Sequence, residues 1–180
     1  MQVNINRLHK DRLFKDIFAS PESKGNALQL YNALNSTDYK DENDLEVYTI
    51  SDAIYMRMKN DFSFILNGDL NLYEQQSTFN LNMPLRGLFY FSKQYERFVG
   101  GNSQMIYSTR LKKLPTPKYV VFYNGGDERP EREVLKLSDA FENQNYGDEE
   151  YVPSLEVRAL ALNINYGHNK ALPDACRQNC

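Results

Sequence analysis

The sequence predicts an α/β protein in which a mixed β-sheet is flanked by helices. Segments with apolar residues at helical spacing alternate with short apolar or alternating runs that are typical of strands. Two of the alternating runs are joined by Asn67-Gly68, the strongest short-range signal of a β-hairpin. At 180 residues and 21.0 kDa the chain has the size of one domain. We therefore expect residues 1–180 to form a single domain.

The N-terminal third is expected to begin with helices and to continue into strands. Residues 8–20 and 25–37 each place apolar side chains at helical spacing, and a Pro-containing turn separates the two segments. Residues 44–50 then predict a strand. Residues 51–59 fit either a further strand or a short helix, and the hairpin around Asn67-Gly68 follows.

The second half is expected to add the longest helix and two more strands. Residues 82–101 have Pro84 near a first helical turn, a glycine pair at the end, and apolar residues on one face between. Residues 118–125 and 155–166 predict strands. The charged, turn-rich residues 126–150 are expected to form a surface loop with a short helix.

Composition limits the possible partners. The net charge of −3 gives no general attraction to nucleic acid, so such binding must rest on a local basic patch. No apolar run approaches the length of a membrane span, and the N-terminus lacks the apolar core of a signal peptide. Only two cysteines occur, too few for a disulfide framework. We therefore expect a cytoplasmic protein without a membrane partner.

The hairpin brings polar side chains together on one face. If Asn67 and Gly68 form a two-residue loop, Asp61 faces Glu74, with Cβ atoms about 4.5–5.5 Å apart. Strand alternation adds Gln76 to that face. Two opposed carboxylates repel unless something positive lies between them, and a divalent cation such as Mg²⁺ suits their oxygens. Alternatively, these are hydrated strand ends, or a longer loop shifts the register.

An ordered set of short stretches carries a family resemblance. An Asp, then a β-turn, then Glu-x-Gln on the next strand resembles the PD-(D/E)XK nuclease core in its Glu-x-Gln variant. More narrowly, the chain resembles the Rpn-like family of recombination-promoting nucleases and putative transposases. The stretches that match in order include "DRLFKDIF", "KNDFSFI", "LNLYEQQST", "NMPLRGLFYFSKQYE", "LPTPKYVVFYNG" and "LNINYGHN".

This resemblance implies a restriction-endonuclease-like core and a metal-dependent phosphodiesterase site with Mg²⁺ or Mn²⁺ as cofactor. Asp61 and Glu74 would be metal ligands, and the backbone carbonyl of Gln75 would add a third oxygen. Asp61, Glu74 and Gln76 would form the catalytic set, with Gln76 at the position that usually holds lysine. Glutamine can orient water by hydrogen bonds but supplies no positive charge. Gln76→Lys would then be expected to raise activity.

Basic residues outside the hairpin are candidates for binding nucleic acid. Arg86 stands near the start of the long predicted helix and would contact a phosphate, or else form a surface salt bridge. Lys112, Lys113 and Lys118 would follow a nucleic-acid backbone, or else be ordinary exposed lysines beside a strand.

Two functions of different classes remain open from the sequence. The first is a metal-dependent nuclease of a mobile element, acting on DNA. The second is a nuclease fold that serves as a binding module, for example a phage or mobile-element inhibitor of a host defence complex. The second is favoured by the glutamine at position 76, where the family usually has lysine, and by the net negative charge of the chain. Relatives continue past residue 169 into a further helical region, so the domain is expected to be C-terminally shortened, with a homodimer or a protein partner covering the exposed face.

Overall fold

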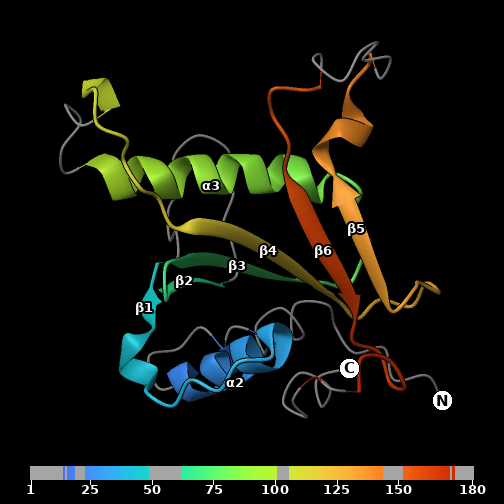
Figure 1. Cartoon of the computed structure of the whole chain (residues 1–180). Coiled ribbons are helices and arrows are strands. Elements are labelled where there is room, and N and C mark those ends of the chain that lie inside the picture. Colours follow the sequence, from blue (N-terminus) through green and yellow to red (C-terminus); the bar gives the residue numbers. More distant parts are fainter. Residues whose placement is uncertain are drawn as a thin grey trace.

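A six-stranded mixed sheet forms the centre of the fold (Figure 1). The computed structural model describes residues 14, 16–18, 23–48, 62–100, 106–143, 152–170 and 172. The strands are β1 (Glu46–Val47), β2 (Phe62–Leu66), β3 (Asp69–Gln76), β4 (Thr116–Tyr123), β5 (Arg132–Lys136) and β6 (Arg158–Asn163), in the order β1-β2-β3-β4-β6-β5. The predicted mixed sheet is therefore confirmed.

Strand directions divide the sheet into antiparallel edges and a parallel centre. β1, β2 and β3 pair antiparallel, β3, β4 and β6 are parallel, and β5 returns antiparallel along β6. The parallel step from β3 to β4 needs a crossover, which the helix α3 (Met83–Val99) supplies. This crossover places α3 over the face of β3 that becomes the candidate site.

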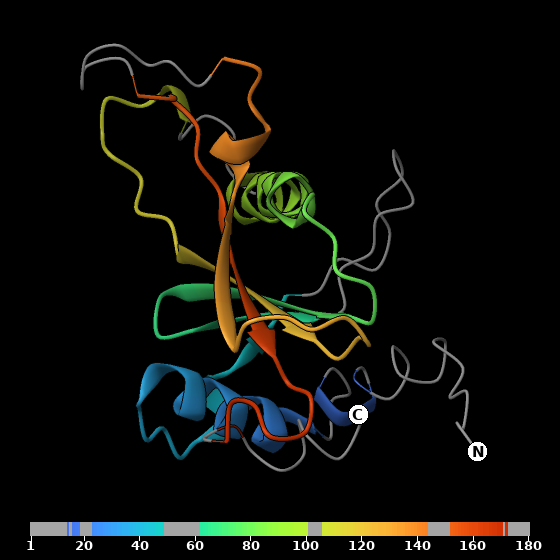
Figure 2. The ribbon, with the colours of Figure 1, turned by 90° about the vertical axis from the view of Figure 1, so that its right-hand side faces the viewer.

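Helices cover both faces of the sheet (Figures 1 and 2). The helix α2 (Lys24–Asn35) lies on one face and α3 on the other, while the 3₁₀ helices η2 (Glu42–Asp44) and η4 (Leu137–Ala140) are short connections. Both predicted longer helices are confirmed. Of the helix predicted at 8–20, Phe14 and residues 16–18 are helical, and the rest lies outside the described residues. In the part of the chain described, no helix is both long and apolar enough to cross a membrane.

Strand alternation builds two separate cores. Tyr73 packs with Phe64 and Phe122 on the α2 side, whereas Leu72 packs with Tyr90 and Tyr119 on the α3 side. Successive side chains of a strand point to opposite faces, so the odd positions of β3 face α2 and the even positions face α3.

The hairpin turn has the geometry that its sequence predicts. Asn67 and Gly68 have φ values of 49° and 79°, the positive values that a type I′ turn requires. The register pairs Phe62 with Tyr73 and Leu66 with Asp69. Asp61, which was predicted to face Glu74, lies outside the described residues.

The region 126–150 was predicted as a surface loop with a short helix, but its described part, residues 126–143, also contains a strand that the prediction missed. Residues 132–136 instead form β5 at the edge of the sheet, and the helix that follows is the 3₁₀ turn η4. Natural sheets protect their edge strands from further pairing by charged residues. The charged composition of residues 132–136 is therefore also typical of a surface loop, and the strand was missed for this reason. The strand predicted at 44–50 is present as β1, which covers only Glu46–Val47. Residues 51–59 lie outside the described part of the chain.

Candidate functional site

Glu74 and Gln76 point from β3 towards α3. The side chain of Gln75, between them, points to the opposite face, where its amide nitrogen donates a hydrogen bond to Oδ1 of Asn124. Glu74 is 1% exposed, so its carboxylate lies inside the protein beneath α3. A carboxylate buried this deeply needs a compensating charge or hydrogen-bond donors.

Arg86 of α3 supplies that compensating charge. Its Nη2 atom lies 3.2 Å from Oε2 of Glu74, and the Arg86 side chain is 30% exposed, so it reaches from the buried carboxylate to solvent. The same Nη2 donates to the hydroxyl of Tyr90 at 2.9 Å. Arg86 was predicted to contact phosphate or to form a surface salt bridge; the ion pair that it forms has a buried partner.

Gln76 completes the contacts of Arg86. With its amide oriented so that donors meet acceptors, the Gln76 oxygen accepts a hydrogen bond from Nη1 of Arg86 at 3.1 Å, and its nitrogen donates to the carbonyl of Thr78 at 3.2 Å. The guanidinium therefore lies against both polar side chains of this face of β3. A positive charge is thus present beside Gln76, although Gln76 carries none.

Burial and charge alter the ionisation of the residues around Glu74. Burial alone would lower the pKa of Arg86, but the Glu74 carboxylate and Tyr90 outweigh it and raise the pKa. Burial, with the Glu74 charge added, raises the pKa of Tyr90 to about 12. Burial and Glu74 also raise the pKa of Tyr119 well above its ordinary value. Glu74 therefore lies among one cation and two neutral tyrosines.

These shifts predict a loss of stability at high pH. An unfolded tyrosine ionises near pH 10, whereas Tyr90 keeps its proton to about pH 12 in the folded protein. The free energy of unfolding should be unaffected by Tyr90 below pH 10 and should fall as pH rises from about 10 to 12. Denaturant unfolding at several pH values measures this fall. It should be smaller in Tyr90→Phe and unchanged in Tyr107→Phe, a tyrosine that is 88% exposed; an equal fall in all three proteins would refute the assignment.

A glycine lets α3 approach the sheet closely at this site. A Cβ atom on Gly87 would lie 2.6 Å from Cε1 of Tyr119. We expect Gly87→Ala to lower the free energy of unfolding by about 1–3 kcal/mol, because overpacking outweighs alanine's higher helix propensity. Urea unfolding tests this. Gly126→Ala is the control, because no atom lies within 4 Å of its added Cβ; a Gly87 variant as stable as wild type would mean that Tyr119 moves aside freely.

The predicted metal ligands are only partly within the described structure. Glu74 and Gln75 are described, and Asp61 is not. The Gln76 carbonyl accepts from Asn124 N of the loop after β4, and carbonyls alternate in direction along a strand, so the Gln75 carbonyl is directed to the β2 side. Among the described residues no three His, Cys, Asp or Glu side chains gather as a metal site.

The four predicted nucleic-acid-binding residues lie in three different places. Arg86 is near the start of α3, whereas Lys112 lies over the ring of Phe98, about 18 Å further along the helix axis, with exposed Lys113 beside it. Lys118 lies on the α2 face and pairs with Asp69 at 2.6 Å. The structure therefore does not bring these residues together as one surface.

Tyr90 and Tyr119 are the site residues that the sequence analysis missed. Arg86 and Tyr90 are four residues apart on a helix, a spacing that places side chains on one face, so this pair had a sequence signal. Tyr119 had none, because its approach to Glu74 depends on how β4 pairs with β3. Comparison of the chain with protein-family models, with curated proteins and with solved structures found no match in any of the three.

Proposed function

We propose that this protein is a metal-dependent nuclease that hydrolyses phosphodiester bonds, most readily those of DNA, at the face of β3 beneath α3. The observation that carries the proposal is the grouping of Glu74, Gln76 and Arg86, in which one guanidinium lies 3.2 Å from the carboxylate and 3.1 Å from the amide oxygen. Carboxylate oxygens for a cation, an amide for water and a fixed positive charge are the groups that phosphodiester hydrolysis needs.

The available donors suit Mg²⁺ or Mn²⁺. Glu74 and the Gln75 carbonyl offer hard oxygen ligands, and Asp61 would add a third from the opposite strand. When bound, such a cation lowers the pKa of a coordinated water and neutralises charge on the phosphate. Glu74 is held for this role by packing beneath α3, and the Arg86 guanidinium lies 3.2 Å from its Oε2 atom.

The remaining residues position the reactants. The Gln76 amide is fixed between Thr78 and Arg86, so it can orient a water without rotating freely. Arg86 is fixed in turn by Tyr90, and its exposed part is available to a phosphate oxygen. Arg86 therefore supplies the positive charge that the glutamine in the lysine position lacks. A nuclease of a mobile element with this site would act in the cytoplasm.

A specific observation favours the second candidate function, a binding module without catalysis. Glu74 is 1% exposed, and its charge is already balanced by Arg86, so the site is electrostatically complete without a metal. A nuclease fold with such a site could persist for the binding of a protein, for example a host defence complex. Fold alone does not decide between the two functions.

One assay separates the two candidates. The protein is incubated with single-stranded DNA, duplex DNA and RNA, each with Mg²⁺, Mn²⁺ or EDTA. We expect cleavage that EDTA abolishes and that is strongest on DNA. Absence of cleavage of all three polymers by a folded protein would favour the binding module, and a pull-down for a protein partner would follow. Cleavage that persists in EDTA would contradict the metal-dependent mechanism.

A further inference from the structure

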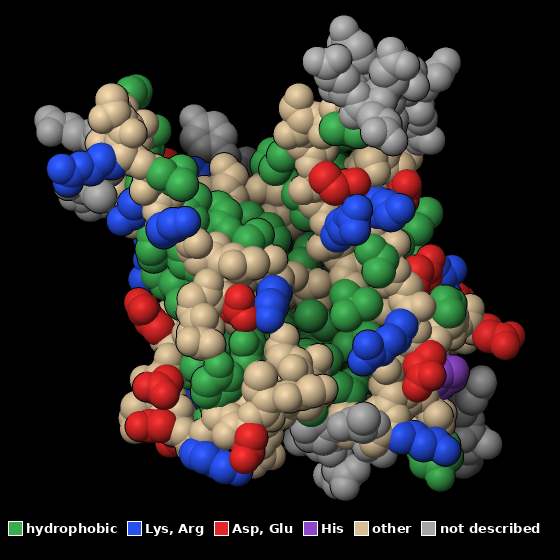
Figure 3. Space-filling view, viewed as in Figure 1, with side chains coloured by type: hydrophobic (Ala, Val, Ile, Leu, Met, Phe, Trp, Pro, Cys, Tyr) green, Lys and Arg blue, Asp and Glu red, His purple; other side chains and the backbone are tan. Residues whose placement is uncertain are grey.

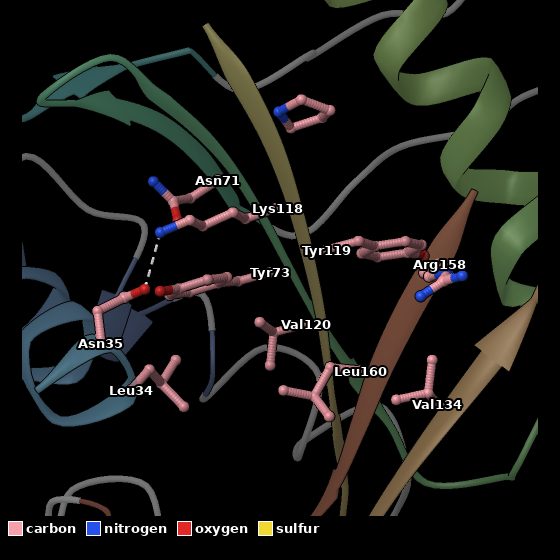
Figure 4. A pocket seen from close by; sticks show the side chains of 11 residues that line it. Leu34, Asn35, Asn71, Tyr73, Lys118, Tyr119, Val120, Val134, Arg158 and Leu160 are labelled. Carbon is pink, nitrogen blue, oxygen red and sulfur yellow. Dashed lines mark hydrogen bonds between the residues drawn. The ribbon is translucent and has the colours of Figure 1, made fainter. Parts of the chain in front are cut away.

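β4 and β6 form a fork that opens a cavity on the opposite face of the sheet. The two strands pair only from Val120–Leu160 to Tyr123–Asn163, although β4 begins at Thr116 and β6 at Arg158. Figures 1 and 4 show them diverging before this paired stretch. If pairing continued, Lys118 and Arg158 would be neighbours across the two strands. The divergence instead leaves a space between them.

The cavity in this fork has the size of a small-molecule site. Its volume is about 360 Å³, within the range of ligand pockets. The walls come from five elements and are mostly apolar; they include Leu34 of α2, Tyr119 and Val120 of β4, Val134 of β5 and Leu160 of β6. Figure 3 shows this hollow with a largely green surface and blue groups at its borders. A flat apolar group would cover this surface.

A fixed cation and a buried acceptor stand at one end of the cavity. Lys118 donates to Oδ1 of Asn35 at 2.9 Å and pairs with Asp69 at 2.6 Å, so its position is set and one of its three N–H groups remains (Figure 4). Asn71 is 1% exposed, and its Oδ1 atom has no donor among the described residues. Such an acceptor is costly to bury unless a ligand supplies a donor.

A second cation stands on the other arm of the fork. Arg158 lines the cavity and is exposed, and no acid of the described residues lies within ion-pair distance of it. An exposed guanidinium is suited to a phosphate, which it can bind through two N–H groups. The cavity thus offers an acceptor and a donor at one end, apolar walls in the middle and an exposed cation at the other end.

We propose that this cavity binds a nucleoside monophosphate whose base carries an exocyclic amine. The base lies against the apolar walls, its amine donates to Oδ1 of Asn71, and a ring nitrogen or carbonyl accepts from Lys118. The phosphate reaches Arg158. Adenine, guanine and cytosine have such an amine, whereas uracil does not. Asn71, Lys118 and Leu160 lie on the α2 face, away from Glu74, and Tyr119 is the lining residue that the cavity shares with the site beneath α3. The proposed nucleotide binding does not require the proposed nuclease activity.

Calorimetric titration in EDTA with each of the four nucleoside monophosphates tests the proposal. We expect AMP, GMP or CMP to bind at least tenfold more tightly than UMP. Arg158→Gln should weaken the monophosphates about tenfold and leave the corresponding nucleosides unchanged, while Asn71→Leu should remove the discrimination against UMP. Arg110→Gln, an exposed arginine away from the cavity, should change nothing.

Several results would overturn the proposal. These are no binding of any nucleotide at millimolar concentration, equal affinity for all four, or affinities that Arg158→Gln does not alter. Inorganic phosphate binding as tightly as the nucleotides would also contradict it. Binding that is lost in Glu74→Gln would assign the nucleotide to the opposite face, and a failure of nuclease activity alone would leave the cavity proposal standing. If Asn71→Leu fails to fold, the titration of Arg158→Gln still tests the proposal, because Arg158 is exposed.

Discussion

Glu74→Gln is expected to reduce metal-dependent cleavage by about a hundredfold or more. Glutamine has nearly the same shape but no negative charge, so it is a poor ligand for a divalent cation. A loss of roughly 3 kcal/mol of transition-state stabilisation corresponds to a factor of about a hundred in rate. The measurement is the initial rate of DNA cleavage with Mg²⁺, for wild type and variant, below the temperature at which either unfolds.

The same variant must be shown to fold. Removing the Glu74 charge leaves Arg86 without its buried partner, but the Arg86 side chain is 30% exposed, so water can hydrate it instead. We therefore expect a loss of only about 1–3 kcal/mol in the free energy of unfolding. Glu96→Gln is the matched control, because Glu96 lies on the exposed side of α3 in a surface pair with Lys93. It should cleave as wild type does.

Two outcomes would contradict the assignment of Glu74. Unchanged cleavage by folded Glu74→Gln would show that another residue holds the metal. An equal loss in Glu96→Gln would show that the assay reports stability and not the site. Asp61→Asn extends the test to the residue that the sequence predicts across the hairpin from Glu74.

The hairpin illustrates how far the sequence can specify a site. The turn at Asn67-Gly68 fixes the register, and the register with strand alternation fixes which residues share a face. The common face of Glu74 and Gln76 was therefore predictable from a few residues. These rules are local, and they act through backbone geometry that changes little from one protein to another.

The partners of that face were not predictable in the same way. Arg86 meets Glu74 only because α3 crosses over β3 at one particular height, which depends on packing such as that of Gly87 against Tyr119. Lys118 is also a cationic residue, yet its position in β4 directs it to the other face. Nothing in composition distinguishes these two residues, because their separation arises from tertiary packing.

The role of Arg86 is tested most directly by moving its positive charge to position 76. Arg86→Gln should lower cleavage roughly a hundredfold, since it removes the fixed cation that the proposed mechanism places beside the phosphate. Gln76→Lys alone, expected from the sequence to raise activity, would place a second cation against Arg86, whose Nη1 lies 3.1 Å from the Gln76 oxygen. With the structure in hand we expect it to lower both stability and cleavage.

The double variant Arg86→Gln, Gln76→Lys restores one cation beside Glu74. We expect it to cleave faster than Arg86→Gln alone, and its unfolding free energy should depart from additivity by about 0.5–3 kcal/mol, because residues in contact are coupled. Strictly additive effects on both measurements would show that Arg86 does not stand in for the missing lysine. The unfolding measurement needs no catalysis, so it reports the coupling of Arg86 and Gln76 even if the protein proves to be a binding module.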